Sequence, residues 1–215
     1  MDFEYTEEQR LLRESLDRLL GDSYEFAKRK TYMAEPDGFS RAMWTQYGEI
    51  GLLGLPFAEE HGGFGGGGVE IMVVMEALGR VIALEPYLTT VVMAGTALGH
   101  AGSAAQNAAL VPKVIDGSLR LAVAHGERQA RYDLSDVMTS ATKTAAGWRL
   151  DGSKSVVVHG DSADKLIVSA RVSGDRNDPD GIGLFLVDPK AAGVARRAYK
   201  MRDGTNAADI AFSGV

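Results

Sequence analysis

Hydrophobic residues recur at helical spacing through the first half of the chain. A first helix is predicted to begin at Thr6, which forms a capping-box pattern with Gln9, and to end near Gly21. Its buried face is formed by leucines three and four residues apart: Leu11, Leu12, Leu16, Leu19 and Leu20. Polar residues occupy the opposite face, which is typical of a helix packed on a core.

Further helices are predicted before residue 118. Ser40 is a candidate N-cap, with Phe39 and Trp44 placed to form a hydrophobic staple around it. Apolar spacing also indicates helices over residues 69–84, 89–100 and 103–115. Pro86 would stop the first of these, because proline lacks the backbone donor that a helix interior requires.

The periodicity changes after Gly117. Short alternating or apolar runs predict strands at residues 119–124, 137–144, 148–151, 155–158, 166–171, 182–187, 194–199 and 207–212, with a turn over 145–147. No helical pattern is interleaved, which favours an antiparallel barrel or sandwich. The sequence therefore predicts an α+β, multi-domain protein, with a helical domain over residues 1–118 and a β-domain over residues 119–215.

Composition excludes several classes of function. Hydrophobic residues make up 45% of the chain and the net charge is −6, which suits a folded protein and argues against nucleic-acid binding. There is no cysteine and the four histidines are far apart, so no metal site is expected. The N-terminus lacks a signal-peptide pattern and the apolar runs are too short to span a membrane, which favours a cytoplasmic protein.

A run of glycines over residues 62–68 contains a literal G-x-G-x-x-G motif. Such a motif binds a pyrophosphate when a strand delivers the loop to a helix N-terminus. The preceding residues 56–61 do not have a strand pattern, and no βαβ unit follows. We therefore interpret the run as a tight loop between helices rather than a dinucleotide site.

Several segments, taken in order, resemble the acyl-CoA dehydrogenase family across the whole chain. They are the Thr6–Gln9 start, the GLLGLP stretch at 51–56, the glycine loop, LVP at 110–112, AVAHGE at 122–127, LDGSK at 150–154, the strand at 167–171, and residues 184–187 and 193–194. An ordered series of this kind is more specific than any single motif.

The resemblance implies a helical N-terminal domain, a middle β-domain and a C-terminal four-helix domain, the last absent from this chain. FAD would lie between the last two domains and across a subunit interface. The implied reaction is α,β-dehydrogenation of an acyl-CoA in fatty acid metabolism, with a dicarboxylyl-CoA such as pimeloyl-CoA as one candidate substrate. Electrons would pass to electron-transferring flavoprotein. A larger acyl-CoA dehydrogenase subunit, or a second copy in a dimer or tetramer, is the expected partner.

The resemblance also implies that the catalytic base lies in the C-terminal domain, so no catalytic residue is expected here. Without that base, we expect the chain to be inactive by itself. It ends at FSGV, within or just after its last predicted strand, so we expect a fragment.

Two segments would hold the flavin in the family. The first corresponds here to Ala124, His125, Gly126 and Glu127, followed by Ser135 and Asp136. Gly126 replaces a threonine whose hydroxyl bonds the flavin pyrimidine, so only backbone donors could remain. Ser135 would approach the pyrophosphate or the substrate, and Asp136 the substrate. Glu127 and Asp136 could equally be solvated loop carboxylates.

The second flavin segment corresponds to Val156, Val157, Val158 and His159. Val156 replaces a tryptophan that packs on the flavin, and Val158 replaces a threonine that bonds near flavin N5. A backbone amide at Val158 could still donate. His159 could offer a polar group at the flavin edge, although a histidine in such a position is more often a surface residue.

These departures leave alternatives open. One is a non-catalytic structural subunit that completes the site of a larger partner dehydrogenase, and another is an unrelated helical–β binding module. Arg128, Arg131 and Lys154 could face the distal carboxylate of a dicarboxylic acyl group, but we expect them to be solvated surface cations.

Overall fold

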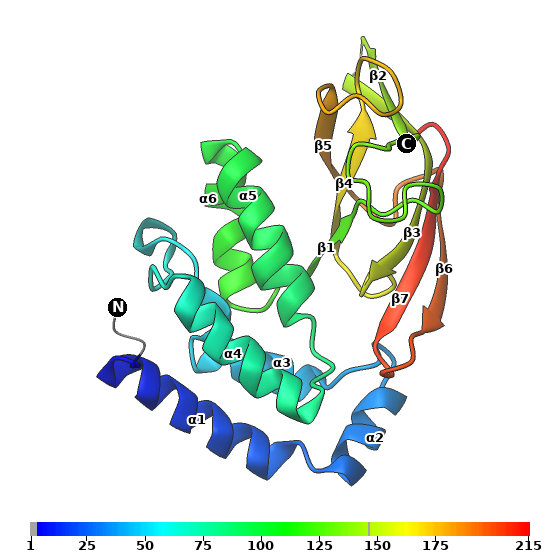
Figure 1. The fold of residues 1–215 in the computed structure, drawn as a ribbon. Coiled ribbons are helices and arrows are strands. Elements are labelled where there is room, and N and C mark those ends of the chain that lie inside the picture. Colours follow the sequence, from blue (N-terminus) through cyan, green and yellow to red (C-terminus); the bar gives the residue numbers. More distant parts are fainter. Residues whose placement is uncertain (1–3, 146) are drawn as a thin grey trace.

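The computed structural model describes residues 4–145 and 147–215. The front half holds helices α1 (Glu7–Ser23), α2 (Phe26–Ala34), α3 (Arg41–Glu49), α4 (Gly68–Val81), α5 (Gly95–Ala101) and α6 (Ala104–Ile115). Short 3-10 turns η1 (Leu52–Gly54) and η2 (Glu59–His61) lie between α3 and α4, and a π-helical segment, η3 (Tyr87–Ala94), precedes α5. The strands of the back half stand beside these helices (Figure 1).

Side-chain caps fix where the helices begin. Thr6 accepts from the Gln9 backbone N–H at 3.2 Å, and the Gln9 side chain accepts from the Thr6 N–H, so the predicted capping box is confirmed. Ser40 caps α3 as predicted, by accepting from the Met43 N–H. These bonds satisfy N–H groups that have no partner within the helix.

Three predictions for the helical half were incomplete. Helix α2 was not expected, because it is short and none of its residues is fully buried, although Tyr32 and Met33 pack against the helical core. Helix α4 ends at Val81, ahead of Pro86, because Ile82 adopts a left-handed backbone with φ of 50°. The helix expected over residues 89–100 begins earlier, at Tyr87, and its first part is π-helical.

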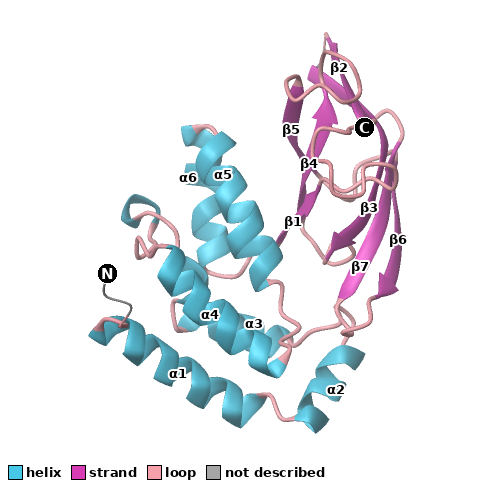
Figure 2. Ribbon diagram, viewed as in Figure 1, coloured by secondary structure: helices cyan, strands magenta, loops and turns pink. Residues whose placement is uncertain are grey.

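Seven strands form one curled sheet in the back half (Figure 2). They are β1 (Leu121–Ala124), β2 (Ser140–Thr144), β3 (Gly147–Val158), β4 (Lys165–Arg171), β5 (Ile182–Val187), β6 (Val194–Lys200) and β7 (Asn206–Phe212). The α+β arrangement is confirmed. The sheet is mixed rather than purely antiparallel, because β1 pairs with β4 in parallel and β2 makes one parallel bridge to β4.

The strands expected at residues 148–151 and 155–158 are one long strand, β3, whose pairing with β7 shifts register between Lys154 and Val157. The turn predicted over residues 145–147 includes Ala146, which lies outside the described residues. The glycine run at 62–68 connects η2 to α4, so no strand precedes it and the interpretation as a loop is confirmed.

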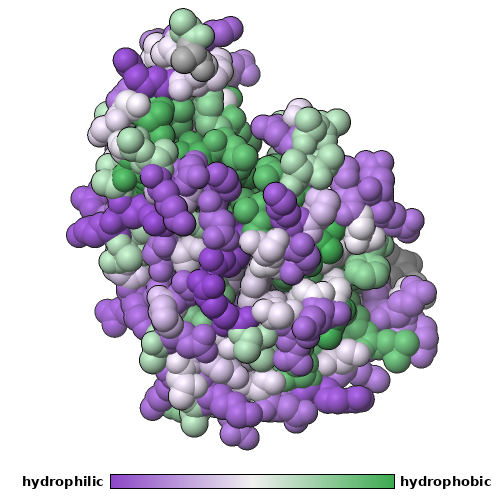
Figure 3. All heavy atoms as spheres, turned by 180° about the vertical axis from the view of Figure 1, so that it is seen from behind, coloured by the Kyte–Doolittle hydropathy of each residue, from purple (hydrophilic) through white to green (hydrophobic). Residues whose placement is uncertain are grey.

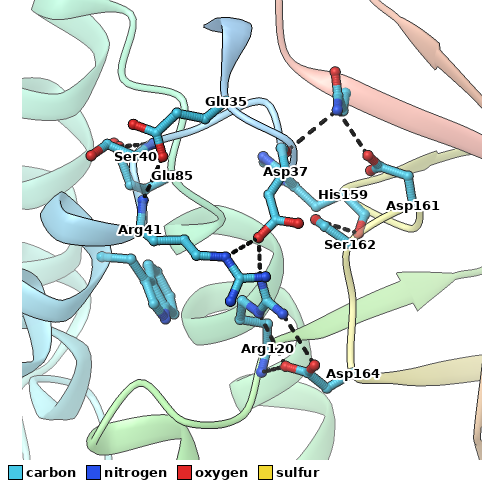
Figure 4. Close-up of polar contacts among 12 residues, drawn as sticks. Glu35, Asp37, Ser40, Arg41, Glu85, Arg120, His159, Asp161, Ser162 and Asp164 are labelled. Carbon is cyan, nitrogen blue, oxygen red and sulfur yellow. Dashed lines mark hydrogen bonds and ion pairs between the residues drawn. The ribbon is translucent and has the colours of Figure 1, made fainter. Parts of the chain in front are cut away.

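The two halves are joined by an ion-pair and hydrogen-bond network. Arg120, just before β1, donates to Asp37 at 2.8 Å and to Asp164 at 2.9–3.1 Å. Figure 4 shows Arg120 between these two carboxylates. Asn206 at the start of β7 donates to the Asp37 carbonyl and to the Asp161 carboxylate. The contacts fix how the sheet stands relative to the helices.

Within the described residues, no helix combines the length and apolarity needed to cross a bilayer. The same part of the chain contains no cluster of three or more histidine or acidic side chains that could hold a metal ion.

Candidate functional site

A cavity of about 1090 Å³ lies where η3 meets the sheet. Its walls come from η3, the end of β1 and the loop after it, the irregular part of β3, and strands β6 and β7. The lining side chains are Thr89, Met93, Val123, His125, Gly126, Glu127, Arg128, Arg131, Tyr132, Leu134, Ser155, Val156, Val158, Arg197, Ala198, Tyr199 and Asp209.

The cavity brings both predicted flavin segments together. His125, Gly126 and Glu127 line it from the end of β1, and Val156 and Val158 line it from β3. Ser155 connects the two segments, since its backbone N–H donates to the Gly126 carbonyl at 2.8 Å. Residues about thirty positions apart in the chain therefore form one wall.

Glu127 is buried, which rules out the alternative that it is a solvated loop carboxylate. It pairs with Lys154 at 2.7 Å and accepts from the Thr139 N–H at 3.0 Å. Burial alone would raise the pKa of Glu127, but hydrogen bonds from Lys154, Thr139 and Gln129 lower it to about 2. The carboxylate anchors the loop after β1 and remains ionised.

Lys154 was expected to be a surface cation and is instead fully buried. Its ammonium donates to Glu127, to the Ser169 hydroxyl at 3.0 Å and to the His125 carbonyl at 3.2 Å. Burial lowers the pKa of Lys154, against the opposing effect of Glu127. Because three acceptors surround the ammonium, it has no donor left to face a substrate carboxylate.

Three consecutive backbone amides at this wall have no hydrogen-bond acceptor in the part of the chain that the structure describes. Within the described residues, the N–H groups of Gly126, Glu127 and Arg128 donate to no other group. A Cβ at Gly126 would lie 3.1 Å from the Ser155 carbonyl oxygen and would meet no other described heavy atom within 4 Å outside the adjacent residues. Unpaired amides beside an open cavity suit a ligand rich in acceptors, such as the pyrimidine edge of a flavin.

Val156 stands at the bulge of β3 in an unusual conformation. Its φ is 54°, a left-handed value that a β-branched residue rarely adopts, and its side chain is 57% exposed. The Val156 N–H donates to Asp209 at 3.3 Å, which holds the bulge in place. Val157, between the two lining valines, points into the sheet core, and Ala124 is likewise fully buried.

His159 does not line the cavity. It is buried between the two halves of the chain, so the expectation of a surface histidine was wrong. Its Nε2 donates to the Leu84 carbonyl at 2.9 Å, and its Nδ1 lies 3.3 Å from the Thr89 hydroxyl. Burial lowers the pKa of His159, which keeps the imidazole neutral. The ring therefore ties the start of η3 to the end of β3.

Ser135 and Asp136 also lie outside the cavity lining. The Ser135 hydroxyl donates to Asp133 at 2.6 Å. Asp136 is buried and paired with Arg176 at 2.6 Å, so it is not a solvated carboxylate. Hydrogen bonds from Arg176, set against burial, lower the pKa of Asp136.

Sequence reasoning overlooked ten of the lining residues, among them Thr89, Met93, Arg197, Tyr199 and Asp209. Thr89 and Met93 lie on η3, whose apolar pattern indicates only a helix. The other three lie on β6 and β7, whose place beside β3 depends on strand pairing. No local pattern marks these positions.

Comparison with known proteins identifies the class. The model of the acyl-CoA dehydrogenase N-terminal domain matches residues 6–118, and that of the acyl-CoA dehydrogenase middle domain matches residues 122–215. The chain belongs to the acyl-CoA dehydrogenase family, whose named relatives are oxidoreductases.

Individual relatives support the assignment. The mouse mitochondrial long-chain specific acyl-CoA dehydrogenase is 30% identical over 96% of this chain and 48% of its own length. A variant of the Tcur3481-Tcur3483 steroid ACAD is 31% identical, with a TM-score of 0.86 over 97% of this chain and 55% of that one. The ChsE4-ChsE5 complex of Mycobacterium tuberculosis is 28% identical, with a TM-score of 0.87. The match covers 100% of this chain and 56% of that one. The chain spans about half the length of these relatives.

Proposed function

We propose that the chain is the N-terminal and middle part of an FAD-dependent acyl-CoA dehydrogenase subunit. The reaction would be α,β-dehydrogenation of an acyl-CoA, with electrons passed to electron-transferring flavoprotein. Family membership supports the class, and the observation that carries the proposal is the cavity wall with unpaired amides at Gly126, Glu127 and Arg128.

Bound FAD would accept the hydride from the acyl group. The amides at Gly126–Arg128 would bind its acceptor edge, while Val156 and Val158 would exclude water from one side. The Glu127–Lys154 pair would hold the amides in position, since it anchors the loop that carries them. The residues present thus fit a flavin held mainly by the backbone.

Neither carboxylate at the cavity suits the role of a base for the α-proton. Hydrogen bonds hold the pKa of Glu127 at about 2. Hydrogen bonds from Arg197 and other donors likewise lower the pKa of Asp209 to about 2. A general base works best with a pKa near the working pH. We therefore expect the base to come from a further domain or from another subunit.

The proposed substrate is a dicarboxylyl-CoA such as pimeloyl-CoA. The support for this substrate is a resemblance of residues 35–39, 84–87 and 159–165 to the small subunit of pimeloyl-CoA dehydrogenase. A larger dehydrogenase subunit is the proposed partner, and the similar ChsE4-ChsE5 protein is itself a complex of two subunits. We place the reaction in the cytoplasm, on the basis of the sequence alone.

The second candidate is a structural subunit that completes the site of that larger partner. The residue types at positions 126, 156 and 158 favour it, because glycine and valine offer neither the hydroxyls nor the aromatic ring expected at a flavin site. The two candidates differ in whether this subunit itself contacts the flavin.

Flavin content distinguishes them. The protein is purified alone and together with the larger subunit, and the flavin absorption band is measured in each sample. A Gly126→Pro variant, which removes one unpaired amide, is purified and measured in the same two ways. The leading proposal expects the variant to release flavin from the complex, whereas an unchanged flavin content would support the structural candidate. A flavin-free complex that oxidises no acyl-CoA would overturn the leading proposal.

A further inference from the structure

Three guanidinium groups line one part of the cavity, and we call them the arginine rim: Arg128, Arg131 and Arg197. Arg128 and Arg131 belong to the loop after β1, and Arg197 lies on β6. Asp209 on β7 joins two of them. Its Oδ2 accepts from Arg128 at 3.2 Å and from Arg197 at 2.7 Å.

The rim carries an excess of positive charge. Glu127 is neutralised by Lys154, and burial, followed by the effect of Lys154, lowers the pKa of His125. Three guanidinium groups therefore face one carboxylate, in a chain whose net charge is −6. Within the described residues, Arg131 forms no ion pair.

The donors of the rim are accessible to a ligand. The side chains of Arg128 and Arg197 are 78% and 72% exposed, although both touch Asp209. A guanidinium has five N–H donors, so one bond to Asp209 leaves several for a second oxyanion. The Asp209 carboxylate holds the two side chains together ahead of binding.

The rest of the cavity wall is largely apolar. Its apolar side chains are Met93, Val123, Leu134, Val156 and Val158. A cavity with an apolar wall and a cationic rim is suited to an amphipathic ligand, with an apolar body and an oxyanion.

We propose that the arginine rim is an oxyanion subsite for the carboxylate or phosphate of a ligand whose apolar part lies against the valine wall. The Asp209 carboxylate competes with the ligand, because it pairs with the guanidinium groups of Arg128 and Arg197 until the ligand oxyanion replaces it. The proposal deepens the proposed function, on which it rests for the identity of the ligand as a substrate or cofactor. Binding at the rim itself requires no flavin.

Two substitutions should change affinity in opposite directions. Arg197→Gln should weaken binding of an anion about three- to tenfold, because a charge-assisted hydrogen bond is lost. Asp209→Asn should tighten it, because the competing charge is removed. The Asn carbonyl can still accept from the Val156 N–H and the Tyr199 hydroxyl, which Asp209 Oδ1 accepts at 3.3 and 3.1 Å. A purely structural role for Asp209 would not produce a gain in affinity.

The test is calorimetric titration of the protein with octanoate, octanamide and inorganic pyrophosphate, at low and high salt. Arg149→Gln is the matched control, since Arg149 is an exposed arginine paired with Asp151 and does not line the cavity. We expect octanoate or pyrophosphate to bind, with an affinity that falls with salt, falls in Arg197→Gln and rises in Asp209→Asn.

The probes separate the sources of the oxyanion. Octanoate binding that exceeds octanamide binding indicates a carboxylate, and pyrophosphate binding alone indicates a phosphate. Equal binding of octanoate and octanamide together with no pyrophosphate binding would overturn the proposal, as would variants that do not differ from Arg149→Gln. Because no arm uses flavin, a protein that fails the flavin test can still pass this one.

Discussion

Two buried carboxylates, Glu127 and Glu85, lie in opposite electrostatic surroundings. Glu127 has an ammonium partner in Lys154 at 2.7 Å. Glu85 lies between the hydroxyls of Tyr24 at 2.6 Å and Tyr47 at 3.3 Å, without a cationic partner among the described residues. Burial raises the pKa of Glu85, whereas the donors around Glu127 lower its pKa to about 2. The same residue type therefore responds to pH in opposite ways at the two sites.

Breaking the Glu127–Lys154 pair on one side should destabilise the fold. Lys154→Met leaves a buried carboxylate without its cation, and we expect a loss of about 3–5 kcal/mol in the free energy of unfolding, measured in urea. The double variant Glu127→Gln with Lys154→Met should recover much of the loss. Arg80→Met, which removes an exposed pair with Glu76, is the control and should cost less than about 1 kcal/mol. A loss of stability in Lys154→Met that is no larger than the loss in Arg80→Met would contradict the expectation.

The stability of the Glu85→Gln variant should increase relative to that of the wild type as the pH rises. The folded-state pKa of Glu85 is raised above 4.5, so ionisation opposes folding and the wild type loses stability above pH 4.5. Glutamine removes this loss. Glu127→Gln should show the opposite trend, because the stability from Glu127 is present above pH 4.5 and falls as the pH drops toward 2. Urea unfolding of both variants at pH values below and above 4.5 tests the two trends. The prediction would be refuted if the stability of both variants, relative to the wild type, changed in the same direction with pH.

At the scale of elements, the bulge in β3 decides the shape of the cavity wall. The register shift between Lys154 and Val157 turns Val156 outward, while Lys154 and Val157 stay buried on either side. A second exposed apolar area lies on β5, where Leu184 and Leu186 face the helix α5 side of the molecule. Figure 3 shows apolar residues gathered between the sheet and the neighbouring helices.

Val156→Gly should stabilise the protein. Relief of a left-handed conformation is worth about 1–3 kcal/mol, against about 1 kcal/mol for the added freedom of glycine in the unfolded chain. Little burial is lost, because the side chain is 57% exposed. Val158→Gly, at a neighbouring position without positive φ, is the control and should lower the melting temperature. A lower melting temperature for Val156→Gly as well would show that the bulge is not strained.

At the scale of the whole molecule, a buried network of polar side chains helps to tie the helices to the sheet. Arg120 lies between Asp37 of the helical half and Asp164 of the sheet half, and is only 14% exposed. His159 and Asn206 add bonds from the sheet to Leu84 and Asp37. The cavity wall formed by η3 depends on this alignment.

Arg120→Met should loosen the two halves. It leaves Asp37 and Asp164 without their shared donor, so we expect a loss of about 2–4 kcal/mol and faster amide exchange at η3 and β1. Arg41→Gln is the matched control, because Arg41 also bonds Asp37 but is 68% exposed. Its effect should stay below about 1 kcal/mol. Unchanged exchange at η3 in Arg120→Met would show that the alignment has another source.

Local patterns were sufficient for most elements. The caps at Thr6 and Ser40 and the strand at residues 182–187 follow from short-range rules, because each depends on neighbours within a few positions. Helix α2 was not predicted, since its apolar residues have no distinctive spacing. Apolar spacing predicted a helix over residues 89–100, but not that its first part, in η3, is π-helical.

By itself, the sequence determined the division into a helical and a strand-rich half, the likeness to one family, and the two segments that meet at the cavity. Only the tertiary structure decided the ionic roles. It buried Glu127 with Lys154, placed His159 between the halves, and brought Arg128 and Arg197 onto Asp209. The reason is physical: helix and strand periodicity is a local property of the chain, whereas burial and charge pairing depend on residues that only folding brings together.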